Sequence, residues 1–269
     1  MMSRGLSQRR ACELLGLSRS SLGYRAAPNR NNALTARLRE LAAEEPRLGC
    51  RMAWARLRSE FAPLNIKRVR RIWKAEGLNL RPRKSRRLRS GAKTELLAQH
   101  PGDVWCLDFC HDSCAGGSHF KCLAVVDEAS RECLVLEVAR KMPAEAVVDT
   151  LRVAFAEYGA PKHLRSDNGP EFTAWALRLF LESEGVKHLL IEPGSPWQNG
   201  FAESFVGTFR SECLDAEIFD NLADAQFKTS LWRRFYNEDR PHSSLSYIQP
   251  SVFRRKWQEV KSEGEGTIV

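Results

Sequence analysis

The sequence predicts a mixed α/β domain preceded by a small, basic, all-helical region. Apolar residues recur at helical spacing through the first 77 residues. From about residue 103, short runs rich in Val and Leu alternate with helical patterns, as expected for a sheet with flanking helices. Charge divides at the same place: residues 1–100 carry 24 Lys+Arg and 7 Asp+Glu, whereas residues 101–269 carry 18 and 26.

Composition excludes several protein classes. The chain has 269 residues, of which 43% are hydrophobic and 28% charged, so a collagen-like, disulfide-knot or wholly disordered protein is excluded. No apolar run approaches the ~18 residues that a membrane helix needs. The N-terminus lacks the apolar core of a secretory signal, which predicts a cytosolic location and no membrane partner.

The charge asymmetry indicates that the front part of the chain binds nucleic acid. Its net charge is +17, against −8 for the rest, and a merely solubilising surface would not segregate charge in this way. We expect a helical DNA-binding region over 1–77, a basic linker over 78–100, an α/β domain over 101–256 and a flexible tail over 257–269.

The first helical segment, residues 7–24, has the layout of a helix-turn-helix. Ala11, Leu14 and Leu15 form an apolar stripe, Gly16 breaks it, and Ser18 can cap a second helix. An ordinary helical hairpin has the same pattern. In the helix-turn-helix interpretation, the side chains available to a DNA groove are those of Arg19, Ser20, Ser21 and Arg25.

Residues 33–77 predict three further helices and a second helix-turn-helix. Apolar stripes comprise Leu34, Leu38 and Leu41, then Met52, Leu57 and Phe61. Asn65 can cap the third helix, and Gly77 can end it. This helix would turn Ile66, Val69, Ile72 and Trp73 inward and leave Arg68 and Arg71 for DNA.

The linker continues the basic surface. Residues 78–93 hold seven basic residues and no acid. A solvated charge run is the alternative, but beside a helix-turn-helix we favour contact with a phosphate backbone. The residues placed to make it are Arg81, Arg83, Lys84, Arg86, Arg87 and Arg89.

The back part predicts the order βββαβαβα. The expected strands cover 104–110, 120–128, 132–139, 162–167 and 187–192, and the expected helices cover 143–158, 172–184 and 200–214. Of eight cysteines, Cys106, Cys122 and Cys133 lie in apolar runs, where a thiol behaves as a small hydrophobe. Cys106, Cys110 and Cys114 recur every fourth residue but lack the second pair that a structural zinc site needs.

Three carboxylates stand at positions where a fold exposes chemistry. Asp108 lies inside an apolar strand, where an unpaired carboxylate is costly unless a metal ion or basic partner relieves it. Asp167 ends a strand before a tight turn. Glu203 points off the stripe of Phe201, Phe205 and Phe209, with Gly207 and the phosphate-binding candidate Arg210 on its own face.

Each acid also has a plain explanation as a turn former or a helix surface charge. Asp112 and Asp127 are the best rival carboxylates, and Asp127 fits a structural turn acid. Ser166 and Ser204 stand beside the acids without an obvious base, which disfavours serine-nucleophile chemistry. Asp167 and Glu203 are separated by 35 residues.

Together, the motifs resemble the DDE recombinases, which include transposases and retroviral integrases. More closely, residues 101–256 resemble the integrase-type core of insertion-sequence transposases of the IS-three family, commonly the product of the second of two overlapping frames. The carrying motifs are VWCLDFCHD (104–112), VVDEASRECLVLEV (125–138), LRSDNGPEF (164–172), EPGSPWQNGFAESFVGTFRSECLD (192–215) and FYNEDRPHSSLSYIQPSVF (235–253).

The resemblance implies a ribonuclease-H-like fold, with a mixed five-stranded sheet, and a catalytic, metal-binding triad of Asp108, Asp167 and Glu203. Mg²⁺ suits such carboxylates, Mn²⁺ can substitute, and two ions could clamp an in-line displacement. Water would cleave at the element end, and the freed 3′-OH would attack a second phosphodiester.

The implied partners are double-stranded DNA, both element terminal repeats and target, a second copy of the chain on that DNA, and an upstream-frame DNA-binding protein. The implied location is the bacterial cytoplasm, at the nucleoid. Two alternatives remain open: a non-catalytic DNA-binding protein or repressor from a decayed element, and a simple ribonuclease-H-like nuclease.

Overall fold

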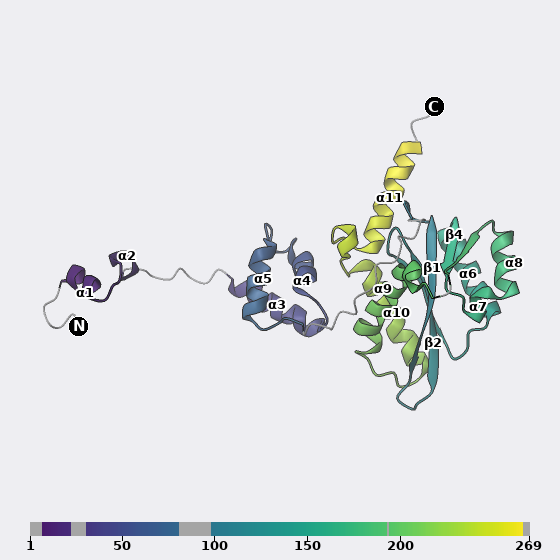
Figure 1. The fold of residues 1–269 in the computed structure, drawn as a ribbon, viewed down its shortest axis with the longest axis horizontal. Helices are drawn as coiled ribbons and strands as arrows, with labels where there is room; N and C mark the ends of the chain where they lie inside the picture. The colour runs from purple at the N-terminus through teal and green to yellow at the C-terminus, as the bar shows by residue number, and fades with distance from the viewer. Residues whose placement is uncertain (1–6, 23–30, 81–97, 193, 266–269) are drawn as a thin grey trace.

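The computed structural model describes residues 7–22, 31–80, 98–192 and 194–265. The helices of residues 31–80 lie next to an α/β core that is built on one sheet, and those of residues 7–22 lie farther from it (Figure 1). None of the helices within the described ranges is long and apolar enough to cross a membrane.

The first two helices form a small unit with little core of its own. α1 (Gln8–Leu14) and α2 (Arg19–Leu22) flank a turn at Gly16, whose φ of +62° favours glycine. Ser18 caps α2 as predicted, since its Oγ accepts from the Ser21 backbone N–H. The predicted inward stripe is wrong at Leu14 and Leu15, which are 63% and 55% exposed, because two such short helices cover only Cys12.

Three longer helices make the second helical unit: α3 (Asn32–Glu44), α4 (Cys50–Leu57) and α5 (Ile66–Ala75). The leucine stripe of α3 is buried as predicted, and Asn65 caps α5 by accepting from the Lys67 N–H. Val69, Ile72 and Trp73 enter the core, but Ile66 is exposed because it lies at the very start of α5, outside the packed turn.

The core is a five-stranded mixed sheet in the order β3-β2-β1-β4-β5. The strands are β1 (Val104–Ser113), β2 (His119–Asp127), β3 (Cys133–Ala139), β4 (His163–Ser166) and β5 (Lys187–Leu190). β1 pairs antiparallel with β2, which pairs antiparallel with β3, whereas β4 is parallel to both β1 and β5. A meander followed by two parallel strands is the ribonuclease-H-like arrangement, as predicted.

Alternation along β1 sends its side chains to two separate apolar layers. Trp105 and Leu107 pack with α6 (Ala144–Tyr158) and α8 (Trp175–Ser183). Cys106 and Cys110 face α9 (Gly200–Phe209) and α10 (Leu222–Glu238) on the other side. Figure 1 shows these two helix pairs on opposite sides of the sheet. Cys106, Cys122 and Cys133 are fully buried among apolar side chains, as predicted.

Two predicted helices are interrupted in the structure. The helix expected over 172–184 is divided into α7 (Pro170–Thr173) and α8, because Ala174 between them has extended backbone angles. The helix expected over 200–214 changes after α9 into a π-helical turn, η3 (Arg210–Leu214). A π-turn adds a residue to the turn, so the side chains after it are rotated about the helix axis.

The C-terminal segment differs most from its prediction. After the short 3₁₀ turn η4 (Ser243–Leu245), α11 (Pro250–Glu265) runs past residue 257, where the sequence predicted a flexible tail. Arg254 explains part of this order, because its guanidinium pairs with Glu132 at 3.2 Å and donates to the Tyr158 carbonyl. The remainder of the predicted tail, residues 266–269, lies outside the described residues.

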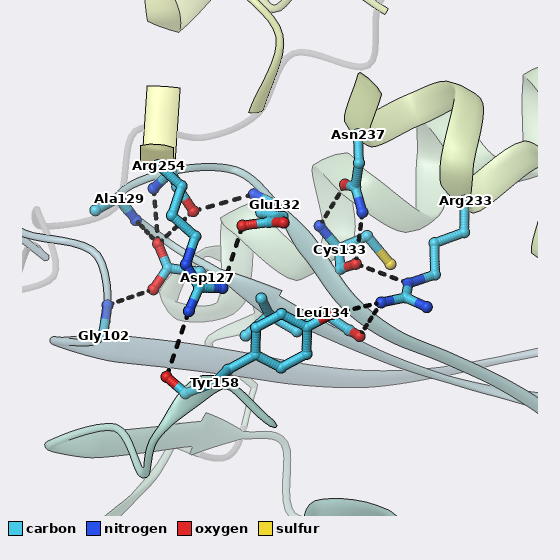
Figure 2. Close-up of polar contacts among 11 residues, drawn as sticks. Gly102, Asp127, Ala129, Glu132, Cys133, Leu134, Tyr158, Arg233, Asn237 and Arg254 are labelled. Carbon is cyan, nitrogen blue, oxygen red and sulfur yellow. Dashed lines mark hydrogen bonds and ion pairs between the residues drawn. The ribbon is translucent and has the colours of Figure 1, made fainter. Parts of the chain in front are cut away.

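Polar side chains of α10 bind the start of the edge strand β3 (Figure 2). Asn237 accepts from the Cys133 N–H and donates to the Cys133 carbonyl, both at 2.9 Å. Arg233 donates to the carbonyls of Cys133 and Leu134 and to the Tyr158 hydroxyl. These contacts satisfy backbone groups that an edge strand would leave unpaired.

Asn237→Ala should therefore destabilise the protein by about 2 to 3 kcal/mol, because it leaves the buried Cys133 N–H without a partner and removes one of the two donors to the Cys133 carbonyl. Urea unfolding would measure this loss. Asn221→Ala is the matched control on the same helix: it removes an exposed N-cap bond to Asp224 and should cost about 1 kcal/mol. Equal losses in the two variants would contradict the role assigned to Asn237.

The second helical unit contacts the α/β core through α4. Trp54 packs edge-on against Tyr247 with ring centroids 5.6 Å apart, and Arg58 donates to the Tyr247 carbonyl. Arg56 donates to the Asp239 carbonyl and lies over the Phe235 ring. A cavity of about 610 Å³ lies along this contact, between the α3–α4 connection and the helices η3 and α10.

Candidate active site

The sheet register places two of the three predicted acids side by side. Parallel pairing of β1 with β4 ends at Cys106 and Arg165, so Asp108 and Asp167, each two residues further on, lie next to each other beyond the ladder. α9 packs on the same face of β1 and brings Glu203 to them. All three carboxylates line one open cavity of about 490 Å³, with Asn168, Gly169, Ile191, Glu192, Gly194, Ser195 and Asn199.

Backbone N–H groups hold the two aspartates in place. Asp108 Oδ1 accepts from the Phe109 N–H at 2.8 Å, and Asp167 Oδ1 accepts from the Gly169 N–H at 3.1 Å. A Cβ at position 169 would come within 3.1 Å of that Asp167 oxygen, so glycine leaves the carboxylate room. Glu203 is exposed on α9, while Phe205 and Phe209 are buried, as the helical spacing predicted.

The three acids interact electrostatically. Burial, together with repulsion from Asp167 and Glu203, raises the pKa of Asp108 from 3.8 to about 6. In the ion-free protein this shift stabilises the fold below about pH 4, and the contribution is lost as pH rises through about 6. A cation between the carboxylates would relieve the repulsion.

The affinity for a divalent ion should therefore fall in acid, because a protonated Asp108 must lose its proton first. We expect Mn²⁺ to bind about tenfold more weakly near pH ~5 than near pH ~7.5, measured by electron paramagnetic resonance of free Mn²⁺. Asp108→Asn should bind weakly at both values. The same wild-type affinity at both would contradict this coupling.

The donor set fits a hard cation. Carboxylates with a neighbouring amide provide oxygen ligands, which Mg²⁺ and Mn²⁺ prefer. Within the described residues, no group of three or more His, Cys, Asp or Glu side chains is placed to hold a metal ion. The three acids line an open cavity, so an ion bound there would also need waters or phosphate oxygens as ligands.

The rival carboxylates lie elsewhere. Asp127 is buried and accepts from the backbone N–H groups of Gly102, Ala129 and Ser130, and from the Ser130 hydroxyl. It is the structural turn acid that the sequence indicated. Asp112 is at the far end of β1, accepts from the Ser113 N–H and does not line the cavity.

Sequence reasoning missed several neighbours of the acids. Ser166 Oγ lies 2.9 Å from His188 Nε2 but donates its proton to the Asp167 carbonyl at 3.0 Å, and Ser166 is fully buried. Lys121 pairs with Glu171 at 2.5 Å and lies 3.6 Å over the Phe109 ring, which ties β2 to the turn after Asp167. Only spatial proximity links these residues, so no sequence spacing indicated them.

The predicted DNA-contacting residues have different surroundings. Arg19, Ser20, Ser21 and Arg71 are exposed. Arg68 is half-buried and donates to Asn31 Oδ1 at 2.7 Å, and the exposed Arg210 donates to the His111 carbonyl at 3.0 Å. The other candidates, Arg25, Arg81, Arg83, Lys84, Arg86, Arg87 and Arg89, lie outside the described residues.

Family models match the chain over three ranges, of which the second and third overlap. Residues 29–86 match an HTH-like domain, and residues 98–196 and 184–250 match two integrase core domain models. Two solved structures with similar folds are a simian T-cell lymphotropic virus intasome chain and the catalytic core domain of BIV integrase. The first has a TM-score of 0.49 at 15% identity and covers 76% of this chain and 70% of that one. The second has a TM-score of 0.46 at 19% identity and covers 60% of this chain and 99% of that one.

Relatives from insertion elements match nearly the whole chain. The IS407 31.7 kDa protein of Burkholderia multivorans is 42% identical over 93% of this chain and 91% of its own length. The IS476 39.2 kDa protein of Xanthomonas euvesicatoria is 41% identical over 94% of this chain and 74% of its own length. The Escherichia coli transposase InsD of IS2 is 27% identical over 87% and 82%. This chain belongs to the family of insertion-element proteins, transposases among them, that carry an integrase core domain behind an HTH-like domain.

Proposed function

We propose that this protein is a metal-dependent DNA strand transferase that cleaves the ends of an insertion sequence and joins them to target DNA. The observation that carries the proposal is the meeting of Asp108, Asp167 and Glu203 at one cavity, from β1, the end of β4 and α9. In the first step, water attacks a phosphodiester at the element end and its P–O3′ bond breaks, which frees a 3′-OH. In the second, this 3′-OH attacks a phosphodiester of the target, whose own 3′ oxygen leaves. No covalent protein intermediate is needed.

The three carboxylates are the residues that would hold Mg²⁺, with two ions as the proposed number and Mn²⁺ as a substitute. When bound, the ions supply charge that stabilises an in-line phosphoryl displacement. The contribution of the protein is to position both DNA strands over the acids and to keep water access controlled. Asp108 must be deprotonated for this, which its raised pKa makes dependent on pH.

DNA would be held along the basic front of the chain. Arg19, Ser20, Ser21 and Arg25 would face one groove, and Arg68 and Arg71 of α5 would contact a second stretch of duplex. The linker residues Arg81, Arg83, Lys84, Arg86, Arg87 and Arg89 would follow the phosphates. Arg210, which begins η3 and donates to the His111 carbonyl, is exposed and would contact a phosphate outside the cavity.

The chain would act as a homo-oligomer, because two element ends must be joined to one target. We further propose that it is the second-frame product of an element of the IS-three family and works with an upstream-frame DNA-binding protein. Its place of action would be the bacterial nucleoid.

The direct test is strand transfer. Purified protein is incubated with a labelled duplex that carries an element end, a plasmid target, and either Mg²⁺, Mn²⁺ or a chelator. Joined product that needs the divalent ion supports the proposal. DNA binding without joining, even with the upstream-frame protein added, would instead indicate a DNA-binding relic or repressor. Cleavage of an RNA–DNA hybrid without joining would indicate a ribonuclease-H-like nuclease.

A further inference from the structure

Asn199 stands where an N-cap residue stands but does not cap. It immediately precedes α9, and its side chain makes no hydrogen bond to the first turn of that helix. Asparagine at this position normally accepts from a backbone N–H two or three residues on. Here the side chain is turned away from the helix, and Asn199 is 3% exposed.

The amide reaches β1 instead. Asn199 Nδ2 donates to the Leu107 carbonyl at 3.1 Å. Leu107 directly precedes Asp108 and is the first β1 residue past the β1–β4 ladder, which ends at Cys106. The Leu107 carbonyl, which the parallel ladder leaves free, is thus bound by Asn199, the residue directly before α9.

Asn199 is also close to Glu203 along the chain. It ends the 3₁₀ turn η2 (Pro196–Asn199) directly before α9, and Glu203 lies in the first turn of α9. Both line the carboxylate cavity. One hydrogen bond therefore fixes the start of α9 relative to the backbone of Asp108, and with it the separation of the first and third carboxylates.

The amide oxygen of Asn199 makes no hydrogen bond to the described residues. This atom, Oδ1, is buried. An unpartnered buried acceptor is costly in a folded protein and indicates a function or an absent partner. This oxygen has almost no accessible surface, so the contribution of the side chain is the hydrogen bond from Nδ2 to the Leu107 carbonyl.

We propose that Asn199 is a positioning residue for the carboxylate site, because its Nδ2 holds the start of α9 to β1 directly beside Asp108. The inference rests on the proposed function, because it assumes that the three acids bind a divalent ion. Asn199 contacts none of the three carboxylates among the described residues, so it would act on them through the positions of α9 and β1.

The test measures ion binding without DNA or turnover. Mn²⁺ affinity is determined by electron paramagnetic resonance for the wild type, Asn199→Ala and Asn199→Leu. The leucine variant has nearly the shape of asparagine, so it keeps packing while removing both hydrogen-bonding groups. We expect about tenfold weaker binding in both, the usual size of an effect from residues that orient metal ligands.

Asn237→Ala is the matched control, since it removes another buried asparagine that binds a strand carbonyl, at a place that does not line the cavity. It should lose stability and keep the wild-type Mn²⁺ affinity. In strand transfer, Asn199→Leu should lower kcat and leave the KM for DNA unchanged. If Asn199 were only structural, the substitution would lower the stability of the protein and leave the Mn²⁺ affinity and kcat unchanged.

The two failures are distinguishable. If the wild type binds Mn²⁺, Glu203→Gln weakens binding and both Asn199 variants stay within twofold of wild type, then only the role of Asn199 is overturned. If the wild type does not bind Mn²⁺, or Glu203→Gln binds it as well as the wild type does, then the proposed ion site itself is wrong and the inference falls with it.

Discussion

Glu203→Gln should reduce DNA strand transfer by about a thousandfold or more while leaving DNA binding intact. The substitution keeps the size of the side chain and removes its charge, so an ion at the cavity loses one of three anionic ligands. Loss of several kcal/mol of charge stabilisation corresponds to about three powers of ten in rate. Asp108→Asn and Asp167→Asn should have effects of the same order, because all three acids line the same cavity.

Asp112→Asn is the control for this experiment. Asp112 lies on β1 four residues after Asp108 but outside the carboxylate cavity, so transfer should remain within about twofold of wild type. Gel-shift binding to the element end, measured for every variant, separates loss of chemistry from loss of DNA contact. Efficient transfer by all three triad variants would rule out the assigned chemistry.

Arg165→Met should destabilise the protein by about 3 to 5 kcal/mol, because it leaves the carboxylate of Glu128 buried without its ion-pair partner. Glu128 and Arg165 form a salt bridge in which both side chains are almost fully buried, at 1% and 4% exposure. Burial already raises the pKa of Glu128 to about 7, although Arg165 and Arg131 oppose the shift. Without Arg165 the carboxyl group should hold its proton to still higher pH.

The pH dependence of this loss gives the prediction a specific signature. Below about pH 7 the carboxyl group of Glu128 can be neutral, so the penalty is smaller; it should grow as pH rises above that value. Urea unfolding at several pH values would measure it. The double variant Arg165→Met with Glu128→Leu should recover most of the stability, since apolar side chains can replace a buried pair. A double variant as unstable as the single one would contradict this explanation.

Much of the α/β core could be predicted because its local and long-range preferences agree. The runs rich in Val and Leu form β1, β2 and β3. Phe205 and Phe209 of α9 are buried and Phe201 is half-buried, so Glu203 was correctly predicted to point off this stripe. The order of the elements predicted a mixed α/β fold, and the resemblance to the DDE recombinases implied the ribonuclease-H-like sheet. Periodicity succeeds where a whole face of an element is covered by neighbours.

The exceptions have local physical causes. The leucines of α1 have helical spacing but no neighbouring surface to cover them. The order of α11 depends on Arg254, whose partners Glu132 and Tyr158 are about a hundred residues away in the sequence. The split between α7 and α8 depends on the backbone angles of one alanine, which no propensity determines.

The sequence indicated the three acids of the candidate site but not the residues that surround them. Asp108 could be identified because a carboxylate is unexpected in an apolar strand, and Asp167 and Glu203 through motifs that resemble a known family. Asn199, Lys121 and His188 are ordinary residues in the sequence, and their contacts arise only when strands and helices are brought together. The pair of Glu128 and Arg165 could have been suspected from charges inside apolar strands.

The three acids differ in how firmly their backbone is held. Asp108 belongs to the central strand, which has neighbours on both sides, whereas Asp167 comes directly after the last residue of β4 and Glu203 lies in the first turn of a helix. Central strands open to solvent least often, and strand ends and helix starts open more readily. Binding of an ion to the three carboxylates would therefore order mainly the β4–α7 turn and the start of α9. These two segments would lose most of the conformational entropy, whereas β1 would keep its position.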